Sequence, residues 1–125
     1  MTEKPSVRRF KFPKKERLHK KKIIEELFEQ GSSTTLYPIQ FWHLPAPNAK
    51  ENQVLFSVPK RQIKKAVVRN KIKRRMKEAY RMNKFILDNV KQNYVLGYVY
   101  LSKKELAFKE INGKLKESLE RLKEL

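Results

Sequence analysis

The chain contains no cysteine, two histidines and three glycines among its 125 residues. Without cysteine it forms no disulfide and no thiolate metal site, and a reducing compartment is the natural expectation. His19 and His43 lie far apart with no carboxylate pattern beside them, which disfavours a zinc site or an acid–base role. The glycines form no phosphate-binding loop, and no Ser-His-Asp set or pair of glutamates stands out. We therefore expect no catalytic residue, metal or cofactor in the polypeptide itself.

Long apolar runs are missing as well. No stretch approaches the ~20 apolar residues of a membrane-spanning helix. The basic N-terminus lacks the apolar centre of a secretion signal. These features predict a cytoplasmic protein, and 125 residues fit one domain large enough to bury a core of its own.

Positive charge is what the chain has in excess. Lys and Arg number 31 against 13 Asp and Glu, which gives a net charge of +18. Residues 1–22 hold ten basic and two acidic residues, residues 60–81 hold eleven and one, and the remainder is balanced. Such a localised excess suggests a footprint on a polyanion, where Lys and Arg displace condensed counterions. An anionic membrane is a distant alternative, because the second segment lacks a broad face of Trp, Phe and Leu to embed in lipid.

The second basic segment has helical periodicity. Apolar residues recur every three or four positions and fall in one narrow arc: Val68, Ile72, Met76 and Ala79. The opposite arc is polar and cationic: Asn70, Lys73, Arg74, Lys77 and Arg81. An ordinary exposed helix interleaves Glu with Lys, whereas here one sign dominates. The pattern therefore favours a helix that packs on a core with one side and binds a polyanion with the other.

The remaining elements follow from spacing and turn residues. We expect a helix over 15–30 ending at Gly31, strands over 32–44 (broken at Pro38) and 53–58, a basic loop over 60–65, the basic helix, more helix over 84–93, a central strand over 94–101, and a helix over 108–122 with Ser102 as its candidate cap. This order predicts an α+β fold, with helices packed mainly on one face of a sheet. Residues 1–14 are expected to form a flexible basic arm, and residues 15–125 a single RNA-binding domain.

Composition and periodicity reach as far as a basic α+β protein that binds nucleic acid. A helix bearing Arg and Asn can grip phosphates and hydrogen-bond base edges. DNA and RNA both remain open at this point, because a recognition helix in a DNA major groove would suit the same segment.

The segment AVVRNKIKRRMKEAYR, residues 66–81, resembles the signature of the bacterial ribonuclease P protein component. The matching residues are Ala66, Val67, Arg69, Asn70, Lys73, Arg74, Glu78 and Arg81. Lys71 stands where the family often has Arg. The flanking segments RLHKKKIIEELFEQG, VLFSVPKR and NYVLGYVY resemble the family's first helix, the strand before the basic loop and the last strand. The resemblance covers roughly residues 15–122.

The resemblance implies a fold of order α-β-β-β-α-β-α, a two-layer sandwich of helices on a mixed four-stranded sheet with a left-handed crossover. It implies the accessory subunit of a ribozyme that removes the 5′ leader from precursor tRNA, with hydrolysis by the RNA subunit using Mg²⁺. The implied partners are ribonuclease P RNA and the leader, and we expect a monomer in isolation. The runner-up is a ribosomal or RNA-chaperone protein, followed by an architectural DNA-binding protein.

Site residues carry over by position in the motif. The implied contacts to the RNA subunit are Lys65, Arg69, Asn70, Lys71, Lys73, Arg74, Lys77 and Arg81. The implied leader cleft, between the first helix and the sheet, has as candidates Ile24, Phe28, Ile39, Phe41, Trp42, Lys60 and Arg61. Two features depart from the family. Ile24 stands where Phe is common, and the loop before Ala66 contains no glycine.

Overall fold

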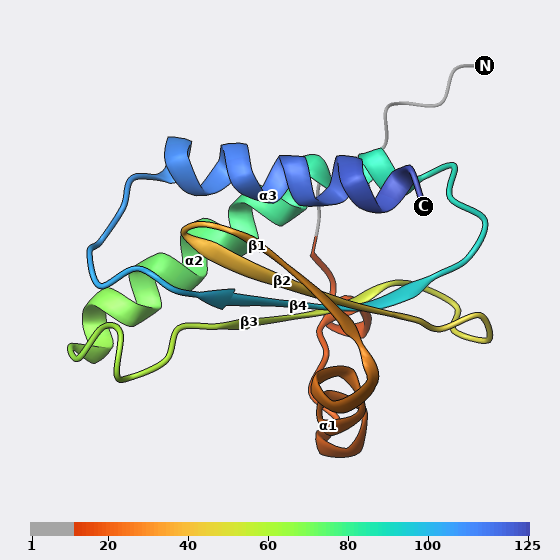
Figure 1. Ribbon diagram of the computed structural model, residues 1–125, viewed down its shortest axis with the longest axis horizontal. Coiled ribbons are helices and arrows are strands. Elements are labelled where there is room, and N and C mark those ends of the chain that lie inside the picture. The colour runs from red at the N-terminus through yellow and green to blue at the C-terminus, as the bar shows by residue number, and fades with distance from the viewer. Residues whose placement is uncertain (1–11) are drawn as a thin grey trace.

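The computed structural model describes residues 12–125, which form a four-stranded sheet covered by helices on both faces (Figure 1). The helices and strands are α1 (Lys21–Gln30), β1 (Ser32–Leu36), β2 (Ile39–Pro45), β3 (Gln53–Ser57), α2 (Ala66–Asn83), β4 (Tyr94–Tyr100) and α3 (Phe108–Lys123), with 3₁₀ turns at Lys14–Glu16 and Lys84–Leu87. Helices α2 and α3 lie on one face of the sheet and α1 on the other. No helix among the described residues is long and apolar enough to span a membrane.

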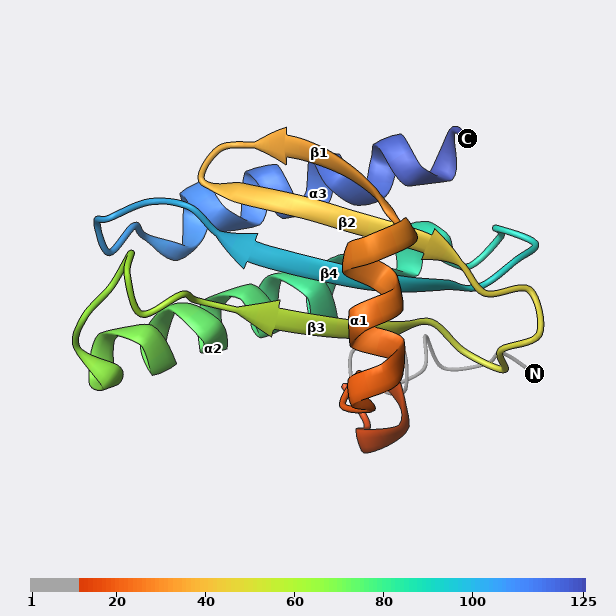
Figure 2. The same ribbon diagram turned by 60° about the horizontal axis from the view of Figure 1, so that its bottom comes forward.

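The strand order is β1-β2-β4-β3, so the last strand in sequence lies inside the sheet. β1, β2 and β4 pair antiparallel, and β3 pairs parallel to β4. Figure 2 shows β3 and β4 pointing the same way with α2 behind them, which makes the β3–α2–β4 connection left-handed. This arrangement departs from the usual right-handed rule. The expected element order, mixed sheet and central position of the last strand are all confirmed.

The larger core lies between the sheet and helices α2 and α3. The apolar stripe of α2 is buried as its spacing predicts, with Ile72, Met76 and Ala79 completely inaccessible. The sheet supplies stacked rings, since Tyr98 lies 5.0 Å from Phe41 and 5.7 Å from Phe56 between ring centroids. Such apolar and aromatic burial is the main driving force for folding. It fixes which side of α2 faces the protein and which faces solvent.

A smaller core joins α1 to the opposite face of the sheet. Leu27 is its centre and packs with Val95, while Phe28, Trp42 and Leu44 are partly buried around it. Gly97 of β4 allows this close approach, because a Cβ there would lie 2.9 Å from Cδ2 of Leu27. α1 is thus docked over one part of the sheet rather than along its whole length, as Figure 2 shows.

Several boundaries differ from the sequence-based expectation. α1 begins at Lys21 and not at residue 15, because the preceding chain runs extended and the Leu18 amide donates to the Val54 carbonyl at 3.0 Å. α1 ends at Gly31 as expected, but with φ −76°, so no left-handed cap is involved. Ser102 does not cap the last helix, whose N-cap is Ala107. The Ser102 hydroxyl instead accepts a hydrogen bond from the Lys104 amide.

Two further predictions of secondary structure are corrected by the structure. The strand predicted over 32–44 is a hairpin, in which β1 and β2 are joined by a turn at Tyr37 and Pro38 with a cis peptide bond. The helix expected over 84–93 is a 3₁₀ turn that stops at Leu87. The end of the expected flexible arm is ordered, because Phe12 packs edge-on against Phe56 and Tyr80 at 5.8 and 5.7 Å. Residues 1–11 of that arm lie outside the described part of the chain.

Candidate RNA interface

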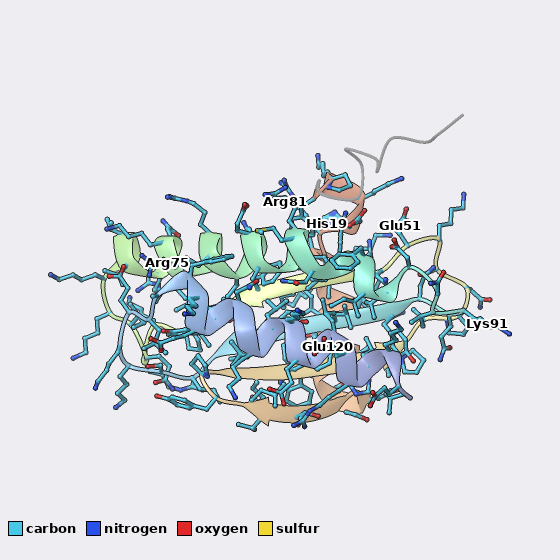
Figure 3. All side chains as sticks on the ribbon, turned by 90° about the horizontal axis from the view of Figure 1, so that it is seen from above. His19, Glu51, Arg75, Arg81, Lys91 and Glu120 are labelled. Atoms are coloured by element: carbon cyan, nitrogen blue, oxygen red, sulfur yellow. The ribbon has the colours of Figure 1, made fainter. Side chains whose placement is uncertain are left out.

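The outer side of α2 carries the strongest cationic surface of the described chain. Asn70, Lys71, Arg74 and Lys77 are exposed along it. Lys73 and Arg81 lie at its margins and are half-buried. Figure 3 shows α2 along one side of the molecule, with Arg81 extending outward from it. Because Ile72 and Met76 hold the opposite side of the helix in the core, this face is presented rigidly.

Glu78 is the one acidic residue of α2, and it is neutralised in place. The Arg81 guanidinium donates to both of its carboxylate oxygens, one of them at 3.1 Å from Nε. These hydrogen bonds lower the pKa of the Glu78 carboxyl and raise the pKa of Arg81. The carboxylate therefore does not present an uncompensated negative charge to a bound phosphate. Because Arg81 donates N–H groups to Glu78, only its remaining N–H groups can contact an RNA.

Arg69 has a structural task that its place in the motif does not reveal. It is half-buried, and its Nη1 donates to the carbonyl oxygens of Ile63 at 3.0 Å and Lys64 at 2.8 Å. Both acceptors belong to the basic loop between β3 and α2. Charge-assisted hydrogen bonds of this kind are stronger than neutral ones. Arg69 therefore fastens the loop to the helix.

Hydrogen bonds and a buried side chain fix the conformation of the basic loop, which contains no glycine. The Gln62 and Ile63 amides donate to the Pro59 carbonyl at 3.0 and 3.2 Å, and the Ile63 side chain is buried. No residue of the described chain has a positive φ, so the missing glycine causes no backbone strain here. The loop exposes four cations next to α2: Lys60, Arg61, Lys64 and Lys65.

Arg75 links α2 to the segment between β4 and α3. Its guanidinium donates to the Leu106 carbonyl at 2.9 Å and pairs with Glu105 at 2.9 Å. Helical periodicity already leaves Arg75 out of the cationic arc that contains Arg74, one residue earlier, which is exposed. The contact across the chain shows that Arg75 holds the fold, whereas Arg74 is offered to a ligand. Sequence reasoning could not identify the partners of Arg75.

The structure brings only part of the predicted leader cleft together. Phe28 of α1 and Trp42 meet, with ring centroids 5.1 Å apart, and Ile24 of α1 packs in the same small cluster. Ile39 and Phe41 are wrong for this cleft: they are 0% and 2% exposed and belong to the core under α2 and α3. The physical reason is strand alternation, which sends Phe41 and Trp42 to opposite faces.

The part of the sheet beyond α1 exposes residues that this prediction did not include. Gln40 and Val99 are cross-strand partners, and Gln40 shares the face of Trp42 by alternation. Ser57 pairs with Val99, which continues the row onto β3. All three are partly exposed. The row leads from Trp42 toward the end of β3, where Lys60 and Arg61 follow. Period-two counting from Trp42 could have found Gln40, but not its neighbours on other strands.

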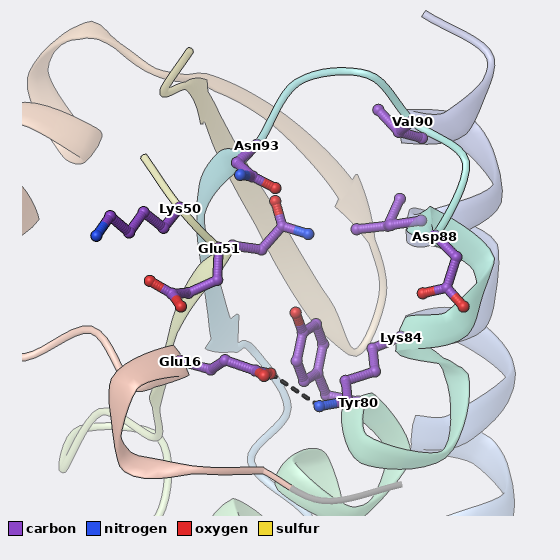
Figure 4. A pocket seen from close by; sticks show the side chains of 10 residues that line it. Glu16, Lys50, Glu51, Tyr80, Lys84, Asp88, Val90 and Asn93 are labelled. Carbon is purple, nitrogen blue, oxygen red and sulfur yellow. Dashed lines mark hydrogen bonds and ion pairs between the residues drawn. The ribbon is translucent and has the colours of Figure 1, made fainter. Parts of the chain in front are cut away.

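A hollow of about 340 Å³ opens between the 3₁₀ turn at Lys14–Glu16, the end of α2 and the loop before β3 (Figure 4). Glu16 and Lys84 form an ion pair of 2.9 Å across it. Tyr80 lies beneath, and burial raises the pKa of its hydroxyl well above the usual value. Glu51 and Asp88 also line this hollow, so its charge is mixed. It does not extend the cationic surface of α2.

The chain matches the model of one protein family, described as ribonuclease P, over residues 12–123. It belongs to the ribonuclease P protein family. It is 30% identical over 119 residues to a ribonuclease P protein component of Porphyromonas gingivalis, an alignment that covers 90% of this chain and 87% of the relative. It is 36% identical over 98 residues to that of Petrotoga mobilis, covering 77% and 75%.

Solved structures of this family share the fold. The ribonuclease P protein of Staphylococcus aureus superposes with a TM-score of 0.72 at 18% identity, covering 86% of this chain and 94% of that one. The protein from Thermotoga maritima gives 0.71 at 22% identity, covering 85% and 96%. The resemblance read from residues 66–81 is thereby confirmed, and so is the ribonuclease P protein-like fold class.

Proposed function

We propose that this chain acts as the protein subunit of ribonuclease P, binding the enzyme's RNA subunit and the 5′ leader of precursor tRNA. The observation that carries the proposal is the family match over residues 12–123, which includes an α2 surface where the single carboxylate is neutralised. A tRNA-processing subunit needs to hold a structured RNA firmly. It needs no catalytic group of its own if the RNA subunit performs the hydrolysis.

The outer side of α2 is the proposed contact to the RNA subunit. Arg74 would supply a forked donor to a phosphate, while Lys71 and Lys77 would act as point charges on either side of it. Asn70 can reach a base edge or a sugar hydroxyl. The basic loop, held by Arg69, would extend this surface beyond the start of the helix. Rigid presentation matters because little side-chain order then has to be gained on binding.

The opposite face is the proposed track of the leader. Phe28 of α1 and Trp42 of β2 offer aromatic edges, and the row of Gln40, Val99 and Ser57 offers a floor that is polar at both ends and apolar at Val99. Unpaired bases stack on aromatic side chains, and their backbone follows cations. Lys60 and Arg61 lie at the end of β3 where such a strand would leave the sheet. Ile24 packs here without providing a stacking platform.

Under this proposal Mg²⁺ acts in the RNA subunit, where phosphate and water oxygens are its preferred ligands. The protein neutralises phosphates around that site and fixes the substrate's orientation. The proposal includes a cytoplasmic location, where precursor tRNA is made, and a monomeric protein in the absence of RNA.

The test is cleavage of a leader-bearing precursor tRNA by a bacterial ribonuclease P RNA at low Mg²⁺. We expect strong stimulation by the full-length protein and none by an equally basic protein of unrelated fold. The double variant Lys71→Glu, Arg74→Glu should unfold at the same temperature as the wild type but fail to stimulate. Absence of stimulation by the folded wild-type protein with its own RNA would contradict the proposal and favour a ribosomal or RNA-chaperone role.

A further inference from the structure

A concave site lies at the turn between β1 and β2, away from both surfaces described above. It has a volume of about 400 Å³, within the range of ligand pockets. Three parts of the chain contribute to its walls: Tyr37 and Pro38 of the turn, Ser102, Lys104 and Leu106 of the segment after β4, and Glu110 and Lys114 of α3. These parts are distant in sequence, so the site exists only in the folded protein.

The walls are held by a network of hydrogen bonds. The Tyr100 hydroxyl donates to the Lys104 carbonyl at 2.6 Å and accepts from the Leu106 amide at 3.1 Å. The Leu101 amide donates to the Pro38 carbonyl at 2.7 Å, which ties the turn to the end of β4. Arg75 of α2 completes the network through the Leu106 carbonyl. The site is therefore preformed and mechanically connected to α2.

Tyr37 is the unusual feature of this site. Its side chain is 60% exposed, although tyrosine normally buries most of its ring. Lys104 and Lys114 line the same hollow as this ring, and Glu110 is the one acidic residue among its lining residues. An aromatic platform flanked by cations is the combination that binds unpaired nucleotides, and a carboxylate oxygen can accept from the amino group of a base.

The position of the site indicates which RNA would fill it. Besides the β1–β2 turn, its lining comes from the β4–α3 segment and from α3, and α3 lies on the same face of the sheet as α2, opposite α1 (Figure 1). Arg75 joins the two regions directly. A leader strand crossing the α1 face would not reach Tyr37, whereas a large RNA docked on α2 could continue over α3.

We propose that this site holds one unpaired nucleotide of ribonuclease P RNA, with its base stacked on Tyr37 and its phosphate beside Lys104 and Lys114. The inference rests on the proposed function, because it assumes that α2 docks that RNA. It adds a contact outside the basic motif, built by a turn and a helix that carry no run of positive charge.

The first test is the affinity of the full-length protein for ribonuclease P RNA. Tyr37→Ala should weaken binding by about 5- to 150-fold, the range that loss of one stacked base produces. Tyr37→Phe and Tyr37→Trp should restore it, because they keep the ring. Lys104→Ala should reduce the slope of log affinity against log salt by about one phosphate contact. Lys91→Ala is the matched control, since Lys91 is exposed at the opposite end of the molecule (Figure 3).

The second test locates the contact. A photoreactive p-benzoylphenylalanine in place of Tyr37 should crosslink to a single-stranded position of the RNA subunit. Crosslinking to the leader of bound precursor tRNA instead, or wild-type affinity in a folded Tyr37→Ala protein, would overturn the inference. If the wild-type protein itself showed no preference for ribonuclease P RNA over an unrelated RNA of equal length, the proposed function would fail first. The two failures are therefore distinguishable.

Discussion

Arg69 and Arg74 belong to the same motif, but the structure predicts different consequences when each is removed. Arg74 is exposed on the outer side of α2, whereas Arg69 donates to two carbonyl oxygens of the basic loop. Arg74→Ala should leave the free energy of unfolding within about 0.5 kcal/mol of the wild type, as for most surface substitutions. Arg69→Ala should lower it, because the Ile63 and Lys64 carbonyls lose a charged donor.

The magnitude for Arg69 follows from its contacts. Hydrogen bonds to charged groups contribute about 1.5–3 kcal/mol when buried. Arg69 is half-buried and the Lys64 carbonyl is solvent-accessible, so we place the loss for the two bonds together at about 1–2 kcal/mol. This corresponds to a decrease in melting temperature of roughly 3–8 °C for a domain of this size. Arg69→Lys should fall between, because an ammonium group can reach one carbonyl but cannot span both as a fork.

Two assays separate the effects. Thermal unfolding of the free protein measures the structural part, and RNA binding over a range of salt concentrations measures the phosphate part. Arg74→Ala should lower the salt slope by about 0.7–0.9, the value for one phosphate contact. Arg69→Ala should weaken binding mainly because the loop becomes mobile, so its affinity should fall while its salt slope stays close to that of the wild type. The reasoning is refuted if Arg69→Ala melts with the wild type and behaves as Arg74→Ala does in the salt series.

Other regions of the molecule give shorter tests. Gly97→Ala should lower the free energy of unfolding by about 1 kcal/mol, because the new Cβ would meet Leu27 at 2.9 Å and push α1 outward. The preference of the holoenzyme for precursor over mature tRNA should fall, while the affinity of the protein for the RNA subunit stays the same. An unchanged preference would contradict the proposed leader face. Ile24→Phe should increase affinity for leader-bearing substrate by up to about 1–3 kcal/mol, measured against a leaderless tRNA, because it adds a stacking platform beside Phe28. Burial lowers the pKa of His43 below its value in the unfolded chain. The folded state therefore binds fewer protons than the unfolded state, so the free energy of unfolding should fall as the pH drops through about 6.5. His43→Gln should remove this dependence and His19→Gln should not, as denaturant titrations between pH 8 and 5 would show.

The parts of the fold that depend on local pattern could be read from the sequence. The spacing of Ile72, Met76 and Ala79 identified the buried side of α2, because a helix places such residues in one arc regardless of what covers them. The continuous apolar run of Tyr94–Tyr100 identified the central strand for a similar reason, since both faces of that strand are covered. In each case one element alone carries the information.

Features that depend on two distant segments could not be read in this way. Strand alternation requires Phe41 and Trp42 to lie on opposite faces, but the packing of Leu27 on Gly97 decides which of the two faces α1. The start of α1 at Lys21 depends on the Leu18 amide finding the Val54 carbonyl. Arg75 is held by its partners Glu105 and Leu106, some 30 residues away. Helical periodicity alone places Arg75 at the edge of the cationic face and says nothing about these partners.

The sheet separates the two proposed RNA contacts, and this has a consequence for how variants should behave. The α1 side and the α2 side share no surface in the middle of the molecule, so substitutions at Trp42 and at Arg74 should combine additively in their effects on substrate binding. The basic loop is different, because it follows β3, precedes α2 and is fixed by Arg69 to the helix. Displacing this loop would move Lys60 and Arg61 on one side and Lys65 on the other. A loop variant such as Ile63→Ala, which removes the buried anchor, should therefore impair both contacts together. If Ile63→Ala weakened binding of the RNA subunit alone, the loop would belong to one face only and the leader track would have to end before Lys60.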